Sequence, residues 1–167
     1  KISEAKVKEL SKVKQKILGQ IQHYKKTAPN FKAISQIIEK TFDDTKSNSL
    51  VELNINSLKN ICEYLGLDFN YKIASEEKYP LPQIQHAGQW ALEISALEAA
   101  TEYINPPGGK ELFNKSEFDE KNIDLTFLDP PKVNYKTKGY EFIEYLSIID
   151  LLMWNNPEEI KNLLINY

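Results

Sequence analysis

The chain has 167 residues, of which 41% are hydrophobic and 27% charged, as expected for a globular protein with one hydrophobic core. Its net charge of -3 argues against nonspecific nucleic-acid binding, and no apolar run approaches the roughly 20 residues of a membrane span. Every basic residue is lysine, so an anion site would use lysine or backbone N–H groups. A lone cysteine and two histidines predict no disulfide, no metal site and a cytoplasmic location.

Three helices are predicted in the N-terminal part of the chain. The first covers residues 4–25 with Ser3 as its N-cap, because apolar residues recur there every three or four positions. Its lysine-rich face leaves a homo-oligomer open, although such a face is usually only solvated. A second helix is predicted from Asn30 to Phe42, and a third covers residues 50–65.

Predicted strands alternate with helices in the rest of the chain. The strands cover residues 69–73, 101–105 and 123–128, and the helices cover 86–100, part of 112–121, 146–154 and a final segment from Pro157. Strands that alternate with helices usually pair in parallel. The fold class is therefore α/β, a helix-rich chain with a small, mainly parallel sheet flanked by helices.

Two of these helices have predicted buried faces. Helix 86–100 is expected to bury Trp90, Ile94 and Leu97, and the final helix is expected to bury Ile160, Leu163 and Leu164. No interdomain linker is visible, so residues 1–167 are predicted to form a single domain.

The turn after the strand at 101–105 is the first candidate site. Two prolines with fixed φ precede Gly108 and Gly109, which can adopt positive φ and expose backbone N–H groups to a phosphate or carboxylate. Lys110 adds positive charge, and Asn105 ends the strand, where α/β sheets bind ligands. We therefore predict these four residues to bind a ligand, with a purely structural turn as the alternative.

A second candidate site is the start of helix 86–100. The helix dipole disfavours protonation of His86, so a neutral imidazole could act as a base or donate a hydrogen bond. Gly88 and Gln89 allow a ligand to approach closely, so His86 is predicted to be catalytic and Gln89 ligand-binding. Helix capping is the alternative role for His86. Asp150, near the start of helix 146–154, is a further ligand-binding candidate that could instead only stabilise its helix.

Four segments in order resemble the WbqC-like protein family: residues 86–95, 100–113, 123–128 and 146–159. This family is bacterial and is often associated with surface-polysaccharide and O-antigen biosynthesis. The resemblance implies one WbqC-like domain, truncated at its N-terminus, because the family's first strand and its Gln-Pro, Pro and Gly-Tyr motif are not found here. A Rossmann-like sheet follows only by analogy, if that segment resembles a nucleotide-binding unit.

The resemblance leaves two functions open. The first is a transferase that modifies an activated amino sugar by acyl or aminoacyl transfer, with a nucleotide sugar or another anionic small molecule as its partner. The second is a non-catalytic binding or accessory module of a glycan-assembly complex. The lack of a nucleophile-elbow motif and of a zinc helix favours the second. The cofactor, if there is one, stays unknown.

Overall fold

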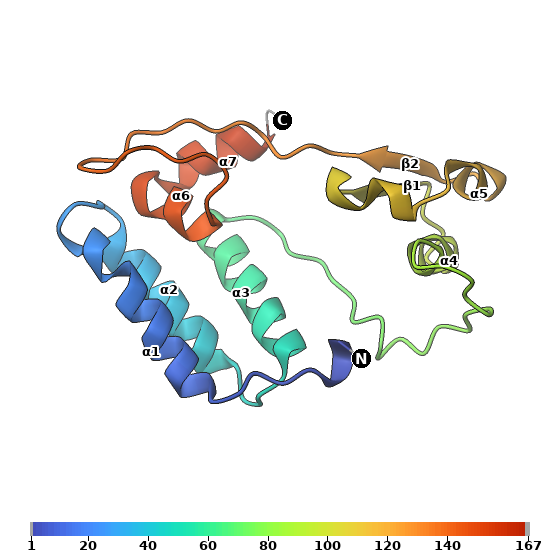
Figure 1. The fold of residues 1–167 in the computed structure, drawn as a ribbon, viewed down its shortest axis with the longest axis horizontal. Helices are drawn as coiled ribbons and strands as arrows, with labels where there is room; N and C mark the ends of the chain where they lie inside the picture. The colour runs from blue at the N-terminus through green and yellow to red at the C-terminus, as the bar shows by residue number, and fades with distance from the viewer. Residues whose placement is uncertain (1, 166–167) are drawn as a thin grey trace. The chain divides into compact units, whose positions relative to one another are not determined.

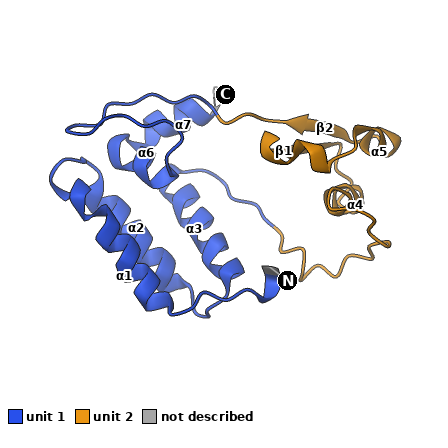
Figure 2. Ribbon diagram, viewed as in Figure 1, with its two compact units in different colours: residues 1–71, 131–167 blue, residues 72–130 orange. Residues whose placement is uncertain are grey.

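The computed structural model describes residues 2–165. The chain forms two compact units, coloured separately in Figure 2. Unit 1 comprises Lys1–Tyr71 and Pro131–Tyr167, and unit 2 comprises Lys72–Pro130. Each unit is described by itself below. In the part of the chain that is described, no helix is both long enough and apolar enough to cross a membrane.

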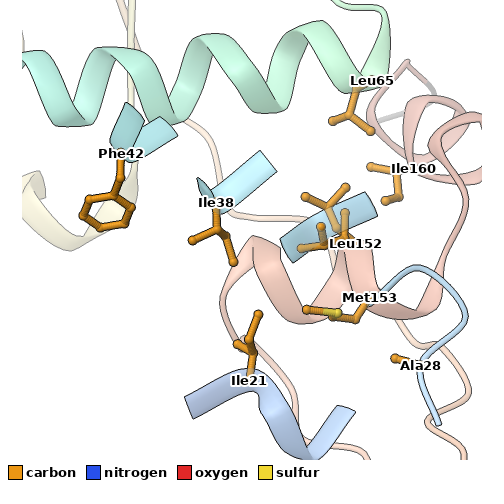
Figure 3. Packing of buried hydrophobic residues seen from close by; sticks show 9 residues of the cluster. Ile21, Ala28, Ile38, Phe42, Leu65, Leu152, Met153 and Ile160 are labelled. Carbon is orange, nitrogen blue, oxygen red and sulfur yellow. The ribbon is translucent and has the colours of Figure 1, made fainter. Parts of the chain in front are cut away.

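Unit 1 consists of helices that surround one core. In chain order they are η1 (Ile2–Glu4), α1 (Leu10–Gln20), η2 (Ile21–Lys26), α2 (Phe31–Asp44), α3 (Leu50–Leu65), α6 (Ile148–Trp154) and α7 (Pro157–Ile165), as Figure 1 shows. Side chains from both segments of unit 1 meet in this core (Figure 3). Its buried members are Ile21, Ala28, Ile34, Ile38, Phe42, Leu65, Leu152, Met153 and Ile160.

Local sequence signals explain where several of these helices begin and end. The Ser49 side chain accepts a hydrogen bond from the backbone N–H of Glu52 at the start of α3, and Gly66 ends this helix with φ 64°. At α7, the backbone N–H of Asn156 donates to Glu159, and the N–H of Glu159 donates back to Asn156, both at 2.9 Å. This reciprocal pair is a capping box, with Pro157 at the first helical position.

The predicted first helix is wrong in its first turns. Lys6 forms an antiparallel bridge with Ser49, and the backbone N–H of Val7 donates to the carbonyl of Asn48 at 2.7 Å. These contacts hold the segment extended, so α1 begins only at Leu10, directly after Glu9 with its positive φ of 54°. Ser3 is therefore not the N-cap of this helix.

The strand predicted at residues 69–73 is also wrong. The rings of Phe69 and Tyr71 stack on each other, with 5.1 Å between centroids, and this segment belongs to no described strand. The two rings therefore pack on each other and form no buried sheet face. Among the residues of α7 whose side chains are described, Ile160 is fully buried, whereas Leu163 and Leu164 are 39% and 46% exposed.

Unit 2 carries the sheet. Its elements are α4 (Gln89–Leu97), β1 (Glu102–Asn105), η3 (Pro107–Leu112), α5 (Lys115–Glu120) and β2 (Asp124–Phe127). The two strands pair in parallel, and Tyr103 lies opposite Leu125. Both side chains pack on a small core made by Leu92, Phe118 and Ile123. The α/β prediction of a helix-rich chain with a small parallel sheet flanked by helices is confirmed.

The buried face of α4 differs from the prediction. Leu92 is 2% exposed, whereas Trp90 and Leu97 are 53% and 44% exposed. Apolar residues occur on more than one side of this short helix, so periodicity alone does not select the side that faces Phe118 and Ile123.

Candidate functional site

The predicted site residues are divided between the two units. Asp150 belongs to unit 1, and the other predicted residues belong to unit 2: His86, Gln89, Asn105, Gly108, Gly109 and Lys110. The two groups are therefore described separately, beginning with unit 2.

The turn after β1 folds as the short 3-10 helix η3. Gly109 has φ −117°, and the glycines with positive φ are Gly66 and Gly139, so this turn does not use the positive φ that its glycines could adopt. The first N–H groups of a helix have no partner within it, and Pro107 has no N–H at all. Because each N–H of a 3-10 helix bonds to the carbonyl three residues earlier, the N–H of Gly109 pairs with Pro106 at the N-cap, and Gly108 carries the free N–H at the start of η3. The ligand-binding role of Gly109 stays a prediction. A Cβ added at Gly108 would meet no heavy atom within 4 Å, so the space beside its Cα is open.

Asn105 and Lys110 lie on either side of this start. The Asn105 side-chain amide donates to the carbonyl of Pro106 at 2.9 Å and accepts from the Tyr103 hydroxyl at 3.2 Å, which fixes the end of β1. The Lys110 ammonium lies 5.7 Å from the centre of the Phe127 ring, as in a cation–π contact. Since Lys110 forms no ion pair with another described residue, its charge is available to an anion.

His86 precedes α4 instead of starting it. Its carbonyl accepts from the N–H of Gln89 at 3.2 Å, and α4 begins at Gln89. His86 Nε2 lies 3.0 Å from Oε2 and 3.2 Å from Oε1 of Glu117 in α5, and the two side chains are 38% and 29% exposed. The Gln89 side chain accepts from the N–H of Gln85 at 2.7 Å and so braces the loop that carries His86.

Gly88 brings the His86 loop onto the end of η3. A Cβ at this position would collide with the carbonyl oxygen of Leu112 and would lie 3.2 Å from Cα of Phe113. Only glycine permits so close an approach of the two backbones. The space at Gly88 is thus filled by the chain itself, and the prediction that Gly88 admits a ligand is wrong. The same contact places two of the predicted segments side by side within unit 2.

Sequence reasoning missed Glu117. It lies three residues after Asn114, whose side chain accepts from the backbone N–H of Ser116 and caps α5. The Asn-x-x-Glu spacing of a capping box could have located this helix start. Nothing in that spacing indicates a partner 31 residues earlier, because the pairing with His86 depends on how α4 and α5 pack.

Asp150 has a defined environment in unit 1. It is 7% exposed, its Oδ1 accepts from the hydroxyl of Tyr24, and its Oδ2 accepts from the hydroxyl of Tyr135. Burial, together with the hydrogen bond to this carboxylate, raises the pKa of Tyr24 to about 12. Ser147 caps α6 as its hydroxyl accepts from the N–H of Ile149, so Asp150 occupies the third helical position. These contacts give Asp150 a structural role, and its ligand-binding role stays a prediction.

Two further observations bear on what the protein could bind. Among residues 2–165, no group of three or more His, Cys, Asp or Glu side chains is placed to hold a metal ion. An open hollow of about 470 Å³ lies in unit 1 beside α2, and Lys25, Lys32 and Glu39 are among its lining residues. None of the predicted site residues lines it.

Comparison with known proteins gives the family of the chain. It is 28% identical over 126 residues to the uncharacterized protein Rv1507c of Mycobacterium tuberculosis. The aligned region covers 75% of this chain and 53% of that protein. The chain thus spans about half the length of this curated relative. No solved structure matches it. The model of the WbqC-like protein family matches residues 1–162, and the chain therefore belongs to this family.

Proposed function

We propose that the protein is a transferase that acts on an activated amino sugar in the biosynthesis of a surface polysaccharide. Membership of the WbqC-like protein family supports the proposal, because the sequence resemblance associates that family with surface glycans. The substrate class is a nucleotide-linked amino sugar, and the group transferred is an acyl or aminoacyl group.

The observation that carries the proposal is the backbone contact between Gly88 and Leu112. It brings the loop that carries His86 against the segment that begins with Gly108 and Gly109. A partly exposed imidazole, a lysine without an ion pair among the described residues and the N–H of Gly108 therefore belong to neighbouring segments of one compact unit. A base beside an anion-binding element suits transfer to a sugar that carries a diphosphate.

Each group has a role in this reaction. Lys110 and the N–H of Gly108 hold the diphosphate of the sugar nucleotide, with Gly109 beside them. The sugar amine attacks the carbonyl carbon of an activated ester or thioester, and its electron pair forms the new C–N bond. His86 accepts the proton that the nitrogen loses and passes it to the donor oxygen or sulfur, which takes the electrons of the broken bond and leaves as an alcohol or thiol.

Calorimetric titration of the protein with UDP-N-acetylglucosamine, UDP and inorganic phosphate tests the binding step. We expect Lys110→Ala to weaken binding of the nucleotide roughly 10- to 150-fold, since a charge-assisted contact contributes roughly 1.5–3 kcal/mol. Lys132→Ala, which removes an exposed lysine of unit 1, is the matched control and should leave binding unchanged. The absence of heat with all three compounds would overturn the proposal.

A non-catalytic binding module is the second candidate. The observation in its favour is that the hydrogen-bonding partner of His86 is a carboxylate, and no described hydroxyl or thiol contacts the imidazole as a nucleophile would. Nucleotide-sugar binding that is accompanied by unchanged glycan assembly in cells carrying His86→Ala would favour this module over the transferase.

A further inference from the structure

The contact between His86 and Glu117 distinguishes the two nitrogens of the imidazole. We propose that Glu117 is a positioning residue, which holds the Nε2–H of His86 and leaves Nδ1 as the nitrogen that accepts the substrate proton. The catalytic part of this inference rests on the function proposed above, whereas the assignment of the two nitrogens does not.

The geometry determines which nitrogen carries the hydrogen. Nε2 of His86 lies 3.0 and 3.2 Å from the two oxygens of Glu117. An ionised carboxylate can only accept hydrogen bonds, so Nε2 must be the donor. A neutral imidazole has one N–H, and the lone pair that can accept a proton is then on Nδ1.

Nδ1 of His86 is available to accept a hydrogen bond from a substrate. It makes no hydrogen bond to any residue that the structure describes, and the His86 side chain is 38% exposed. A base must come within hydrogen-bonding distance of the proton that it removes, and this nitrogen has no protein partner to displace first.

Packing fixes both partners of the pair. Phe118, the neighbour of Glu117 in α5, is 1% exposed in the core of unit 2, and Asn114 caps the same short helix. On the other side, the contact of Gly88 with Leu112 anchors the loop that carries His86. A ring that is held in one orientation loses little freedom in the reaction, which is the advantage of a positioning carboxylate.

His23 provides a contrast within the same chain. Its Nδ1 lies 2.8 Å from the carbonyl oxygen of Gln20. Because a carbonyl can only accept, His23 carries its hydrogen on Nδ1. His23 and His86 are the two histidines of the chain, and the contacts of their rings assign them opposite tautomers.

Nuclear magnetic resonance of the ¹⁵N-labelled protein tests this assignment without any substrate. Long-range ¹H–¹⁵N spectra, recorded well above the usual imidazole pKa of about 6.5, distinguish protonated from lone-pair nitrogens. We expect a protonated Nε2 for His86 and a protonated Nδ1 for His23. A protonated Nδ1 for His86 in the unaltered protein would overturn the inference, and this result does not depend on the folding of any variant.

Two variants of α5 then separate positioning from general stability. Glu117→Ala should convert His86 to a mixture of tautomers and leave His23 unchanged, whereas Glu120→Ala, on an exposed position of the same helix, should change neither. If the protein catalyses the proposed transfer, Glu117→Ala should lower the kcat of that reaction about 10- to 100-fold with little change in KM.

The two proposals can fail independently. If the tautomers are as assigned but no nucleotide sugar binds, then the proposed function fails and the positioning role of Glu117 is retained. If nucleotide sugars bind but His86 keeps a single tautomer in Glu117→Ala, the positioning role is overturned and the proposed function stands.

Discussion

The two units of the molecule are stabilised by cores of very different size. Unit 1 encloses a cluster of buried side chains that come from η2, α2, α3, α6 and α7. The core of unit 2 has three buried members among its described residues, Leu92, Phe118 and Ile123, supported by half-buried Tyr103 and Phe113. Buried apolar area is the main stabilising contribution to a fold, so unit 2 has fewer contacts to lose.

This difference matters for function because the predicted transfer chemistry lies in unit 2. The pair of His86 and Glu117 depends on the packing of α4 and α5 over a two-stranded sheet. A sheet of two strands needs such packing to be stable in water. We therefore expect single substitutions in the core of unit 2 to disturb the candidate site strongly. Comparable substitutions in unit 1 should lower mainly the stability of unit 1.

The largest expected loss of stability comes from substitutions in the two cores. Phe118→Ala should lower the stability of unit 2 by about 4 kcal/mol, and Leu152→Ala should lower that of unit 1 by about 3 kcal/mol, because each leaves a cavity. Native-state hydrogen exchange would measure the loss of protection at amides of β2 and of α3.

Exchange in these two variants also tests the prediction of a single domain. We expect each substitution to reduce protection mainly in its own unit. An equal loss of protection in both units would contradict this expectation and would show that the chain unfolds as the single domain predicted from the sequence.

The next effect concerns the backbone contact in unit 2. Gly88→Ala should destabilise this unit by about 3 kcal/mol, because the new Cβ collides with the carbonyl of Leu112 and must push η3 from α4. Gly108→Ala is the matched control and should change stability by less than about 1 kcal/mol, since its Cβ has open space. Thermal unfolding of both variants checks this, and similar midpoints would show that the backbone contact is unimportant.

The smallest effect concerns Tyr24 in unit 1. Tyr24→Phe should cost about 2 kcal/mol at neutral pH, because a hydrogen bond to a carboxylate is lost. The pKa of Tyr24 is raised from 10.0 to about 12, so the stability that its protonated hydroxyl contributes is complete below pH 10 and disappears as pH rises toward 12.

The measurement for Tyr24 is urea denaturation at several pH values. The stability difference between the unaltered protein and Tyr24→Phe should shrink between pH 10 and pH 12. Tyr71→Phe, which removes an exposed hydroxyl, should show no such change. A constant difference over this range would contradict the role of the contact between Tyr24 and Asp150.

Much of the local structure was readable from the sequence. The bounds of α3, its termination at Gly66, and the capping box at the start of α7 follow from residues that lie close together in the chain. The parallel sheet followed from the order of strands and helices. The four segments that resemble the WbqC-like protein family led to the family that the comparison confirms.

The errors occurred where distant segments decide the conformation. Residues 5–7 lie within the predicted helix, but their backbone pairs with the backbone around Ser49 and is not helical. In α4, apolar residues lie on several sides, and only the position of Phe118 and Ile123 selects Leu92 as the buried one.

The candidate site shows the same division. The sequence determined which residues carry a base, a positive charge and a flexible backbone, because these properties belong to single side chains. Tertiary structure alone decided that Glu117 meets His86 and that the backbone at Gly88 touches Leu112. Such contacts join positions more than 20 residues apart, and their formation depends on the packing of whole helices, which no local pattern of residues specifies.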